Sequence, residues 1–393
     1  MPGALDGFRI VDFSQVIAGP LATRVLADQG ADVIKVEPPA GDILRHMGGI
    51  AGLSPTFATV NRSKRSLVLD VKKSGASEAL ARLVANADVF VQNSRPGAMA
   101  RLGIGPEQLL ARNPRLVYVS ISGFGETGPY AHKRVYDPIV QGMSGLCDIQ
   151  GAGTGPPGLV RVIVPDKVTA LTAAQNITAA LLARERTGKG QHLRLSMLDA
   201  VIAFVWPEGM AYHTFIGEGR RITPVPRRDL VFATKDGHMI ASTVAHREFQ
   251  GFCRAVGKPE WLEDPRFAST AGLVANATAR LEMMAEVLAT RTTAEWLEAL
   301  DREDVPCGPV LTRDRIHEHA QVRANAILVE DEHPVAGAMR QPRPAERLDA
   351  TPSAISRPAP TLGQHSEEVL REAGFSAAEI ASLRGAGALG ATS

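Results

Sequence analysis

Two kinds of apolar periodicity alternate over the first 122 residues, and this alternation constrains the fold more than any other feature of the chain. Stretches with helical spacing, such as 20–30 and 77–87, separate short apolar runs that are typical of strands. The strand-like runs cover residues 8–13, 32–37, 66–71, 88–93 and 115–122. Alternation of this kind builds a mostly parallel sheet with helices on both faces, because parallel strands need crossover connections. The sequence therefore predicts an α/β fold with a Rossmann-like large domain.

The later part of the chain has a different texture. A long Ala-rich stretch from residue 166 predicts a helix that ends at Gly188, and a strand over 192–197 follows. A basic, proline-bearing connector over 217–229 leads to a predicted hairpin with Asp236-Gly237 at its turn. We expect a large α/β domain at 1–224, a smaller α+β domain at 225–330, and a proline-rich extended segment with two short C-terminal helices at 331–393.

Charge and composition exclude several classes of protein. The formal net charge is +1, from 43 basic and 42 acidic residues, so no global field favours nucleic acid or an anionic membrane. The N-terminus lacks the pattern of a signal peptide, and no apolar run approaches the length of a membrane span. The three cysteines (Cys147, Cys253 and Cys307) lie far apart, which argues against a zinc site or a disulfide framework. We expect a cytoplasmic protein without a metal.

Basic residues gather in short clusters. Each cluster is either a solvated face or, where it follows a predicted strand, a place to bind a phosphorylated ligand at the sheet edge. The clusters lie at 61–66, 71–73, 94–101 and 132–134, and in the pairs Arg220-Arg221 and Arg227-Arg228. Two GxGxxG matches, at 123–128 and 153–158, lack the strand–turn–helix context of a dinucleotide site, because prolines interrupt or follow them.

Asp166 stands at the start of a predicted helix, and its carboxylate has two possible roles. It follows a proline and opens the apolar run "RVIVPDKVTALTAAQNITAALLA" at 161–183. One interpretation is a helix N-cap, because Asp accepts hydrogen bonds from the free N–H groups of the first turn. The other is a nucleophile held at a helix start beside a pocket.

Six stretches give the chain a family resemblance that spans most of its length. They are "LDGFRIVDFSQVIAGPLATRVLADQGADVIKVEPP", "DVFVQNSRPGAMARLG", "ISGFGETGPY", "RERTGKGQHLRLSMLDA", "DVPCGPV" and "PTLGQHSEEVL". In this order they resemble the class III CoA-transferases, which include formyl-CoA transferase and carnitine CoA-transferase, with alpha-methylacyl-CoA racemase as a relative. The resemblance implies an interlocked homodimer, in which the segment after 331 crosses over and its helices return to the large domain.

The resemblance also implies the chemistry and the site. The family's nucleophile lies between the "SGFG" loop and the "TGKGQ" turn, which places it at Asp166. It would form a mixed anhydride and then an aspartyl-CoA thioester, with coenzyme A as cosubstrate and no metal. An oxyanion site is expected near the "SGFGETG" loop or the small domain. The residues implied for CoA binding are Val16, Ile17, Ala18, Leu69, Lys72, Asn93, Ser94, Arg95, Arg101, Lys133 and Tyr136.

The expected partners are an acyl-CoA and a small carboxylic acid. Formyl-CoA transferase has glutamine where Ile17 stands and a basic residue where Pro38 stands, which argues against a formyl or oxalyl substrate. Arg227 and Arg228 suit the second carboxylate of a dicarboxylate. Two alternatives stay open: an acyl-CoA racemase or epimerase, and a CoA-binding protein without turnover. The racemase would need an acid–base pair, and the chain has Tyr136-Asp137 where racemases carry a His-Asp pair.

Overall fold

The computed structural model describes residues 1–50, 52–151, 155–217 and 229–390. The chain divides into two compact units. Unit 1 comprises Met1–Pro224 and Ala326–Ser393, and unit 2 comprises Val225–Asn325.

A six-stranded sheet forms the centre of unit 1. Its strands lie in the order β3-β2-β1-β4-β5-β6, and every neighbouring pair is parallel. This confirms the predicted α/β fold with a parallel sheet. The order reverses direction between β1 and β4, and such a reversal opens a crevice at the carboxyl ends of the strands. The strands are β1 (Arg9–Asp12), β2 (Asp32–Glu37), β3 (Lys64–Val68), β4 (Val89–Gln92), β5 (Val117–Ser122) and β6 (Gln191–Ser196).

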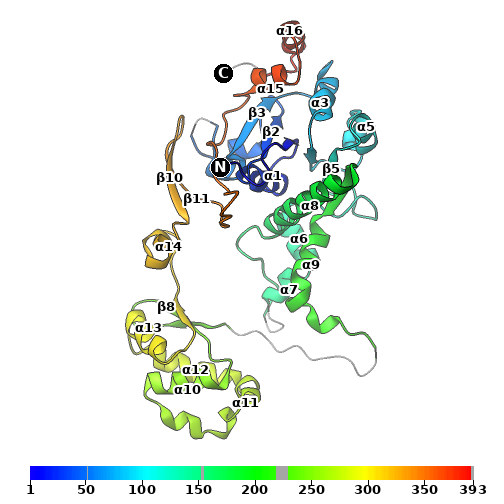
Figure 1. Ribbon diagram of the computed structural model, residues 1–393. Coiled ribbons are helices and arrows are strands. Elements are labelled where there is room, and N and C mark those ends of the chain that lie inside the picture. The colour runs from blue at the N-terminus through cyan, green and yellow to red at the C-terminus, as the bar shows by residue number, and fades with distance from the viewer. Residues whose placement is uncertain (51, 152–154, 218–228, 391–393) are drawn as a thin grey trace. The chain divides into compact units, whose positions relative to one another are not determined.

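Helices cover both faces of this sheet (Figure 1). On one face α1 (Ala18–Asp28) and α8 (Pro165–Thr187) bury the side chains of Ile10, Val91 and Val119 in one apolar cluster. The other face is covered by α3 (Ala76–Ala85), α5 (Pro106–Arg112) and two C-terminal helices, α15 (Ser366–Glu372) and α16 (Ala377–Gly385). Helix α8 ends as predicted at Gly188, which adopts the left-handed conformation with φ 72°.

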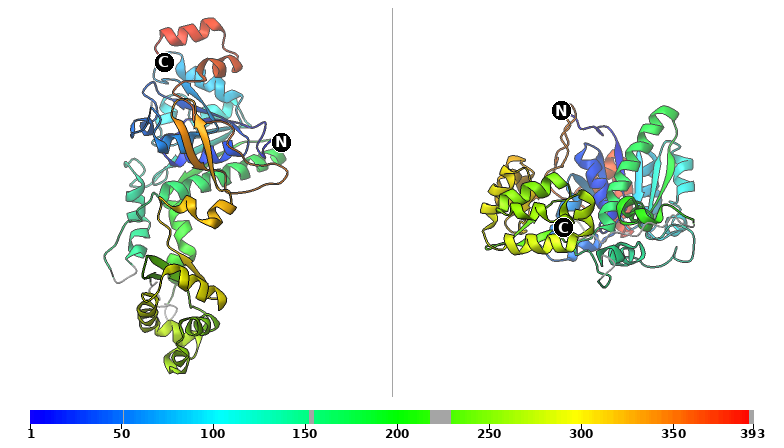
Figure 2. Two further views of the ribbon diagram at one scale, coloured as in Figure 1. Left: turned by 90° about the vertical axis from the view of Figure 1, so that its left-hand side faces the viewer. Right: turned by 90° about the horizontal axis from the view of Figure 1, so that it is seen from below.

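A β-hairpin of β10 (Leu328–His333) and β11 (Gly337–Pro342) lies beside the large sheet (Figure 2). It begins at the end of the predicted small domain and runs into the segment predicted to be extended. Its side chains of Ala336 and Met339 pack against an apolar cluster that includes Phe57. The remaining elements of unit 1 are η1 (Ile43–His46), α2 (Pro55–Asn61), α4 (Ala98–Arg101), α6 (Asp137–Met143), α7 (Leu146–Gln150), α9 (Met197–Gly209) and η2 (Ala211–His213).

The C-terminal segment completes the outer edge of the sheet. Strand β3 is an edge strand, and its free side is bonded by residues more than 290 positions later in the chain. The Ser66 N–H donates to the His365 ring and the Val68 N–H to the Ser366 hydroxyl, each at 3.1 Å. The Asp70 N–H donates to the Ala388 carbonyl at 2.8 Å. The edge is therefore closed against pairing with another strand.

The basic cluster at 61–66 is buried, so both interpretations of it, as a solvated face and as a phosphate site, are wrong. The exposed fractions of Arg62, Lys64 and Arg65 are 2%, 0% and 5%. Each basic group is paired with an aspartate that lies far away in sequence. The pairs are Arg62–Asp28 at 2.9 Å, Lys64–Asp12 at 2.8 Å and Arg65–Asp32 at 2.6 Å.

Unit 2 combines a three-stranded antiparallel sheet with short helices. Strands β7 (Val231–Ala233) and β8 (His238–Ala241) form the predicted hairpin, and β9 (Cys307–Pro309) pairs with β8. Trp296, Phe252 and Met239 lie in its apolar core. The helices are α10 (His246–Val256), η3 (Pro259–Glu263), η4 (Pro265–Phe267), α11 (Thr270–Ala275), α12 (Ala277–Leu288), α13 (Thr293–Arg302), η5 (Ile316–Glu318) and α14 (Ala320–Ala324).

Candidate active site

A cleft of about 560 Å³ lies at the carboxyl ends of β1, β4 and β5, where the strand order reverses. This is the position at which open α/β sheets bind their ligands. The cleft is lined by Phe13, Gln15, Val16, Ala18, Asn93, Ser94, Arg95, Pro96, Ala98, Arg101, Ile121, Ser122, Gly123, Ala131, Lys133, Arg134, Val135, Tyr136, Asp166 and Met197. Nine of the residues predicted for the site are among them: Val16, Ala18, Asn93, Ser94, Arg95, Arg101, Lys133, Tyr136 and Asp166.

The other predicted residues lie elsewhere. Ile17 is buried in the apolar cluster with Leu44, and Leu69 is buried in the core beneath α3, so neither lines the cleft. Lys72 is exposed on the turn after β3, where its backbone N–H donates to the Asp70 carboxylate. Arg220, Arg221, Arg227 and Arg228 fall outside the described residues.

Four cations give the cleft a positive character. Arg95, Arg101, Lys133 and Arg134 line it and are exposed, so their charged groups are accessible to a ligand. The Lys133 ammonium lies 3.5 Å from the centroid of the Tyr130 ring. Guanidinium and ammonium groups in this setting suit phosphate oxygens, which they bind by charge-assisted hydrogen bonds.

Asp166 is the second residue of α8, so the N-cap interpretation is wrong. The N-cap position belongs to Val164, whose side chain makes no capping hydrogen bond. The Asp166 carboxylate instead lies near the backbone N–H of Ala18, the first residue of α1, and this N–H lowers its pKa. The positive end of the α1 dipole adds to this interaction. The partner is a second helix, which local sequence reasoning could not supply.

The surroundings of Asp166 change its acidity. Burial and, to a smaller extent, the nearby charge of Asp137 raise the pKa of Asp166 to about 6, against the lowering effect of the Ala18 N–H. The two aspartates are adjacent, because the Asp166 backbone N–H donates to Asp137 Oδ2 at 3.2 Å. Asp137 is itself buried and accepts a hydrogen bond from the Gln141 amide at 2.7 Å. Asp166 is therefore ionised at neutral pH, and it is more basic than an ordinary carboxylate.

A tight turn between β1 and α1 brings the Ala18 N–H to this place. A Cβ added at Gly19 would lie 2.2 Å from the Ser14 side chain, so the turn approaches the helix too closely for any other residue without a shift. Val16 precedes the helix with φ 68°, a left-handed conformation that is rare for a β-branched residue.

Other kinds of site have less support in the structure. Over the described residues, no three or more His, Cys, Asp or Glu side chains group as they would around a metal ion. In the same part of the chain, no helix has both the length and the apolar character that crossing a bilayer requires. Burial raises the pKa of the Cys307 thiol to about 12, which opposes a role as a thiolate nucleophile.

Sequence reasoning missed part of the cleft. Arg134 belongs to the basic cluster at 132–134, which was a usable signal. Asp137 was noted only as the neighbour of Tyr136, because its closeness to Asp166 depends on how α6 packs near the start of α8. Ser122 and Gly123 open the "SGFGETG" loop, which the sequence marked only as a place for an oxyanion site, and Gln15 gave no signal beyond its place after a strand.

Family comparison gives the class of protein to which this fold belongs: the chain is a member of CoA-transferase family III, whose model matches residues 5–366. It is an enzyme, a CoA-transferase.

Individual relatives have more specific names. The succinyl-CoA:glutarate CoA-transferase of Mus musculus is 34% identical, over 94% of this chain and 86% of the relative. The acetyl-CoA:oxalate CoA-transferase of Acetobacter aceti is 35% identical, over 94% and 96%. Among solved structures, a CaiB/BaiF family protein from Brucella suis superposes with a TM-score of 0.83 at 31% identity, covering 95% of this chain and all of that one.

Proposed function

We propose that the chain moves CoA from an acyl-CoA donor to a small organic acid with Asp166 as the covalent nucleophile. The observation that carries this proposal is the position of the Asp166 carboxylate. It lies in a cleft lined by four exposed cations, its pKa is raised, and the backbone N–H at the start of α1 acts on it. A carboxylate with these properties is ionised, basic and accessible to a thioester.

The reaction then proceeds through two covalent intermediates. A carboxylate oxygen of Asp166 attacks the thioester carbonyl of the donor, the C–S bond breaks, and CoA leaves as a thiolate. The thiolate attacks Cγ of Asp166 in the resulting mixed anhydride, which releases the donor acid as a carboxylate and leaves an aspartyl-CoA thioester. The acceptor carboxylate attacks the same Cγ, and the released thiolate attacks the acceptor's carbonyl. Asp166 is regenerated, and no proton or electron is gained or lost overall.

Two neighbours of Asp166 would favour these steps. The Ala18 N–H, at the positive end of α1, stabilises the oxyanion that forms when Cγ is attacked. Asp137 repels the ionised form of Asp166 but not the acylated form, which carries no charge. This repulsion therefore destabilises the free enzyme relative to the covalent intermediates.

For the substrates we propose a succinyl-CoA-type donor and a dicarboxylic acid of four to six carbons as partners. The names of the relatives support a diacid, because glutarate and oxalate both carry two carboxylates. The second carboxylate needs a cation if it is to leave water. Arg227 or Arg228 would supply it on the evidence of the sequence alone.

We further propose a homodimer in the cytoplasm. Apolar side chains on α8 and α9 are exposed in the single chain, which supports burial of these helices against a second copy. They are Leu171, Leu182, Phe204 and Trp206. Light scattering at low micromolar concentration should give the mass of a dimer, and the mass of a monomer would contradict this part of the proposal.

The nucleophile is tested by Asp166→Asn and Asp166→Ala with succinyl-CoA and glutarate. Both variants should lose transfer while keeping the far-ultraviolet circular dichroism of the wild type. Wild-type protein incubated with succinyl-CoA and hydroxylamine should carry a hydroxamate at Asp166, located by peptide mass spectrometry. The exposed Asp349 is the matched control, because Asp349→Asn makes the same chemical change outside the cleft. Wild-type turnover in Asp166→Ala would overturn the mechanism.

The diacid is tested with Arg227→Ala and Arg228→Ala. In the variant that lacks the pairing residue, KM for succinate should be about tenfold higher or more, because one charge-assisted hydrogen bond is lost. KM for propionate should stay unchanged, because propionate has no second carboxylate. Equal effects on both acids would contradict a role in reading the second carboxylate.

A further inference from the structure

The loop between β1 and α1 is held in a conformation that its own sequence disfavours. Val16 has φ 68°, a region that β-branched residues rarely adopt because the side chain is strained there. Such a residue persists only where its surroundings enforce the conformation. The loop lines the cleft through Gln15 and Val16 and leads directly to Ala18, which lines the same cleft as Asp166 and whose N–H acts on that carboxylate.

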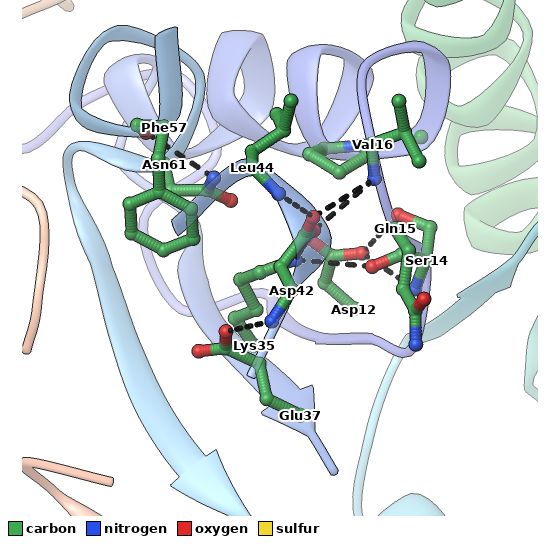
Figure 3. Close-up of polar contacts among 12 residues, drawn as sticks. Asp12, Ser14, Gln15, Val16, Lys35, Glu37, Asp42, Leu44, Phe57 and Asn61 are labelled. Carbon is green, nitrogen blue, oxygen red and sulfur yellow. Dashed lines mark hydrogen bonds and ion pairs between the residues drawn. The ribbon is translucent and has the colours of Figure 1, made fainter. Parts of the chain in front are cut away.

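One buried carboxylate holds the Val16 backbone (Figure 3). The Val16 N–H donates to both oxygens of Asp42, at 3.1 and 3.3 Å. The same carboxylate accepts the Leu44 N–H at 3.0 Å and the Lys35 ammonium at 3.1 Å. Lys35 also donates to the Ser14 carbonyl at 3.0 Å, so the ion pair bonds the loop backbone at two points.

A second buried ion pair holds the two ends of the same loop. Asp12 accepts the Ser14 N–H at 3.0 Å, and Lys64 donates to Asp12 at 2.8 Å and to the Pro20 carbonyl at 2.8 Å. Asp12, Lys35, Asp42 and Lys64 are all fully buried. Burying charges is expensive, and replacing such pairs with apolar residues is often neutral or stabilising. What these pairs have in common is that each bonds the backbone of the β1–α1 loop.

We propose that Asp42 is a positioning residue for CoA transfer: it fixes the left-handed backbone of Val16 and thereby aims the Ala18 N–H at the Asp166 carboxylate. The role rests on the proposed function of Asp166. Asp42 does not line the cleft, so it acts through the loop and not by contact with substrate.

The proposal has a signature that a loss of stability alone does not produce. The Ala18 N–H lowers the pKa of Asp166, so a displaced N–H leaves that pKa higher. The acidic limb of kcat/KM then moves to higher pH. Asp137 from α6 is the charged group that acts on the pKa of Asp166, and the cations Arg95, Arg101, Lys133 and Arg134 line the same cleft. Substitution of Asp42 changes none of these groups.

The test compares Asp42→Asn with Asp28→Asn as the matched control. Asp28 is also a buried, ion-paired aspartate, but it bonds Arg62 at the far end of α1. Asp42→Asn keeps the size of the side chain and removes the charge that Lys35 needs. We expect kcat for succinyl-CoA and glutarate to fall about tenfold or more, the worth of a hydrogen bond to a charged group, with the acidic limb moved to higher pH. Asp28→Asn should lower thermal stability and leave the limb in place.

Two further variants keep the test decisive. Val16→Pro removes the N–H and the left-handed φ but leaves the Lys35–Asp42 pair complete, so it gives an answer even where Asp42→Asn does not fold. It should also move the acidic limb. Val16→Gly added to Asp42→Asn should restore part of the lost kcat, because glycine adopts this φ without strain. An unmoved acidic limb in both Asp42→Asn and Val16→Pro would overturn the proposal. Wild-type protein with no transfer activity on this substrate pair would instead contradict the proposed function.

Discussion

Replacing Asp166 by Asn should make the protein more stable at alkaline pH while it abolishes transfer. Burial and the charge of Asp137 raise the pKa of Asp166 from 3.8 to about 6. The folded protein therefore binds this proton more tightly than the unfolded chain does, and keeping the carboxylate ionised destabilises the fold. At about 1.4 kcal/mol for each tenfold change in affinity, the cost at pH 8 is about 3 kcal/mol.

The sign of the effect sets the pH window. Above pH 6 the full cost is present in the wild type and absent in Asp166→Asn, so the variant is more stable. As the pH falls from 6 toward 3.8 the wild-type carboxylate takes up its proton and the difference shrinks to nothing. For a domain as large as unit 1, about 2 °C per kcal/mol gives a rise in Tm of about 6 °C at pH 8 and about half of that at pH 5.

The assay is thermal unfolding of the wild type and Asp166→Asn at pH 5 and pH 8, at one fixed protein concentration. Asp349→Asn, an exposed change of the same kind, should leave Tm unchanged at both values. A Tm for Asp166→Asn equal to or below that of the wild type at pH 8 would show that the carboxylate is not destabilised by its surroundings. The reasoning from burial and from Asp137 would then be refuted.

Three further results are expected. Asp137→Asn removes the repelling charge, so the pKa of Asp166 should fall and the acidic limb of kcat/KM should move to lower pH in a pH–rate profile. Arg95→Ala should raise KM for the acyl-CoA about tenfold with little change in kcat in steady-state kinetics, whereas Arg112→Ala, on the surface outside the cleft, should change neither. Gly19→Ala should lower the free energy of unfolding by about 1–3 kcal/mol in urea titration, because the added methyl overlaps the preceding loop.

The sequence predicted correctly those strands and turns whose formation depends on neighbouring residues. The structure confirms the strands predicted from the apolar runs at 32–37 and 115–122. It also confirms the hairpin predicted from the turn residues Asp236-Gly237. Strand β3 begins at Lys64, two residues before the predicted run, because Lys64 and Arg65 are buried by ion pairing. Their aspartate partners are dozens of residues away in the sequence, so residue type alone predicts that the Lys64 and Arg65 side chains face solvent.

The site shows the same division between local and distant information. The residue types after β4, such as Asn93 and Arg95, marked the sheet edge from sequence. The contacts that define Asp166, with Ala18 and with Asp137, join three separate helices, and no spacing rule connects them. The β10–β11 hairpin was missed because its strands are largely exposed and carry charges and proline, which weakens the alternation that predicts a strand.

The bonding of β3 by the C-terminal segment has a consequence for how the protein is made. A ribosome delivers β3 about 300 residues before it delivers residues 365–388, which bond the outer edge of this strand. At about 5–20 residues per second, roughly 15–60 s pass between the two. Throughout that interval the edge of β3 is bare, and the part of the apolar face that α15 and α16 later cover is exposed. A message truncated before residue 365 would leave that edge open permanently, and its product should aggregate even though every strand of the sheet has been translated.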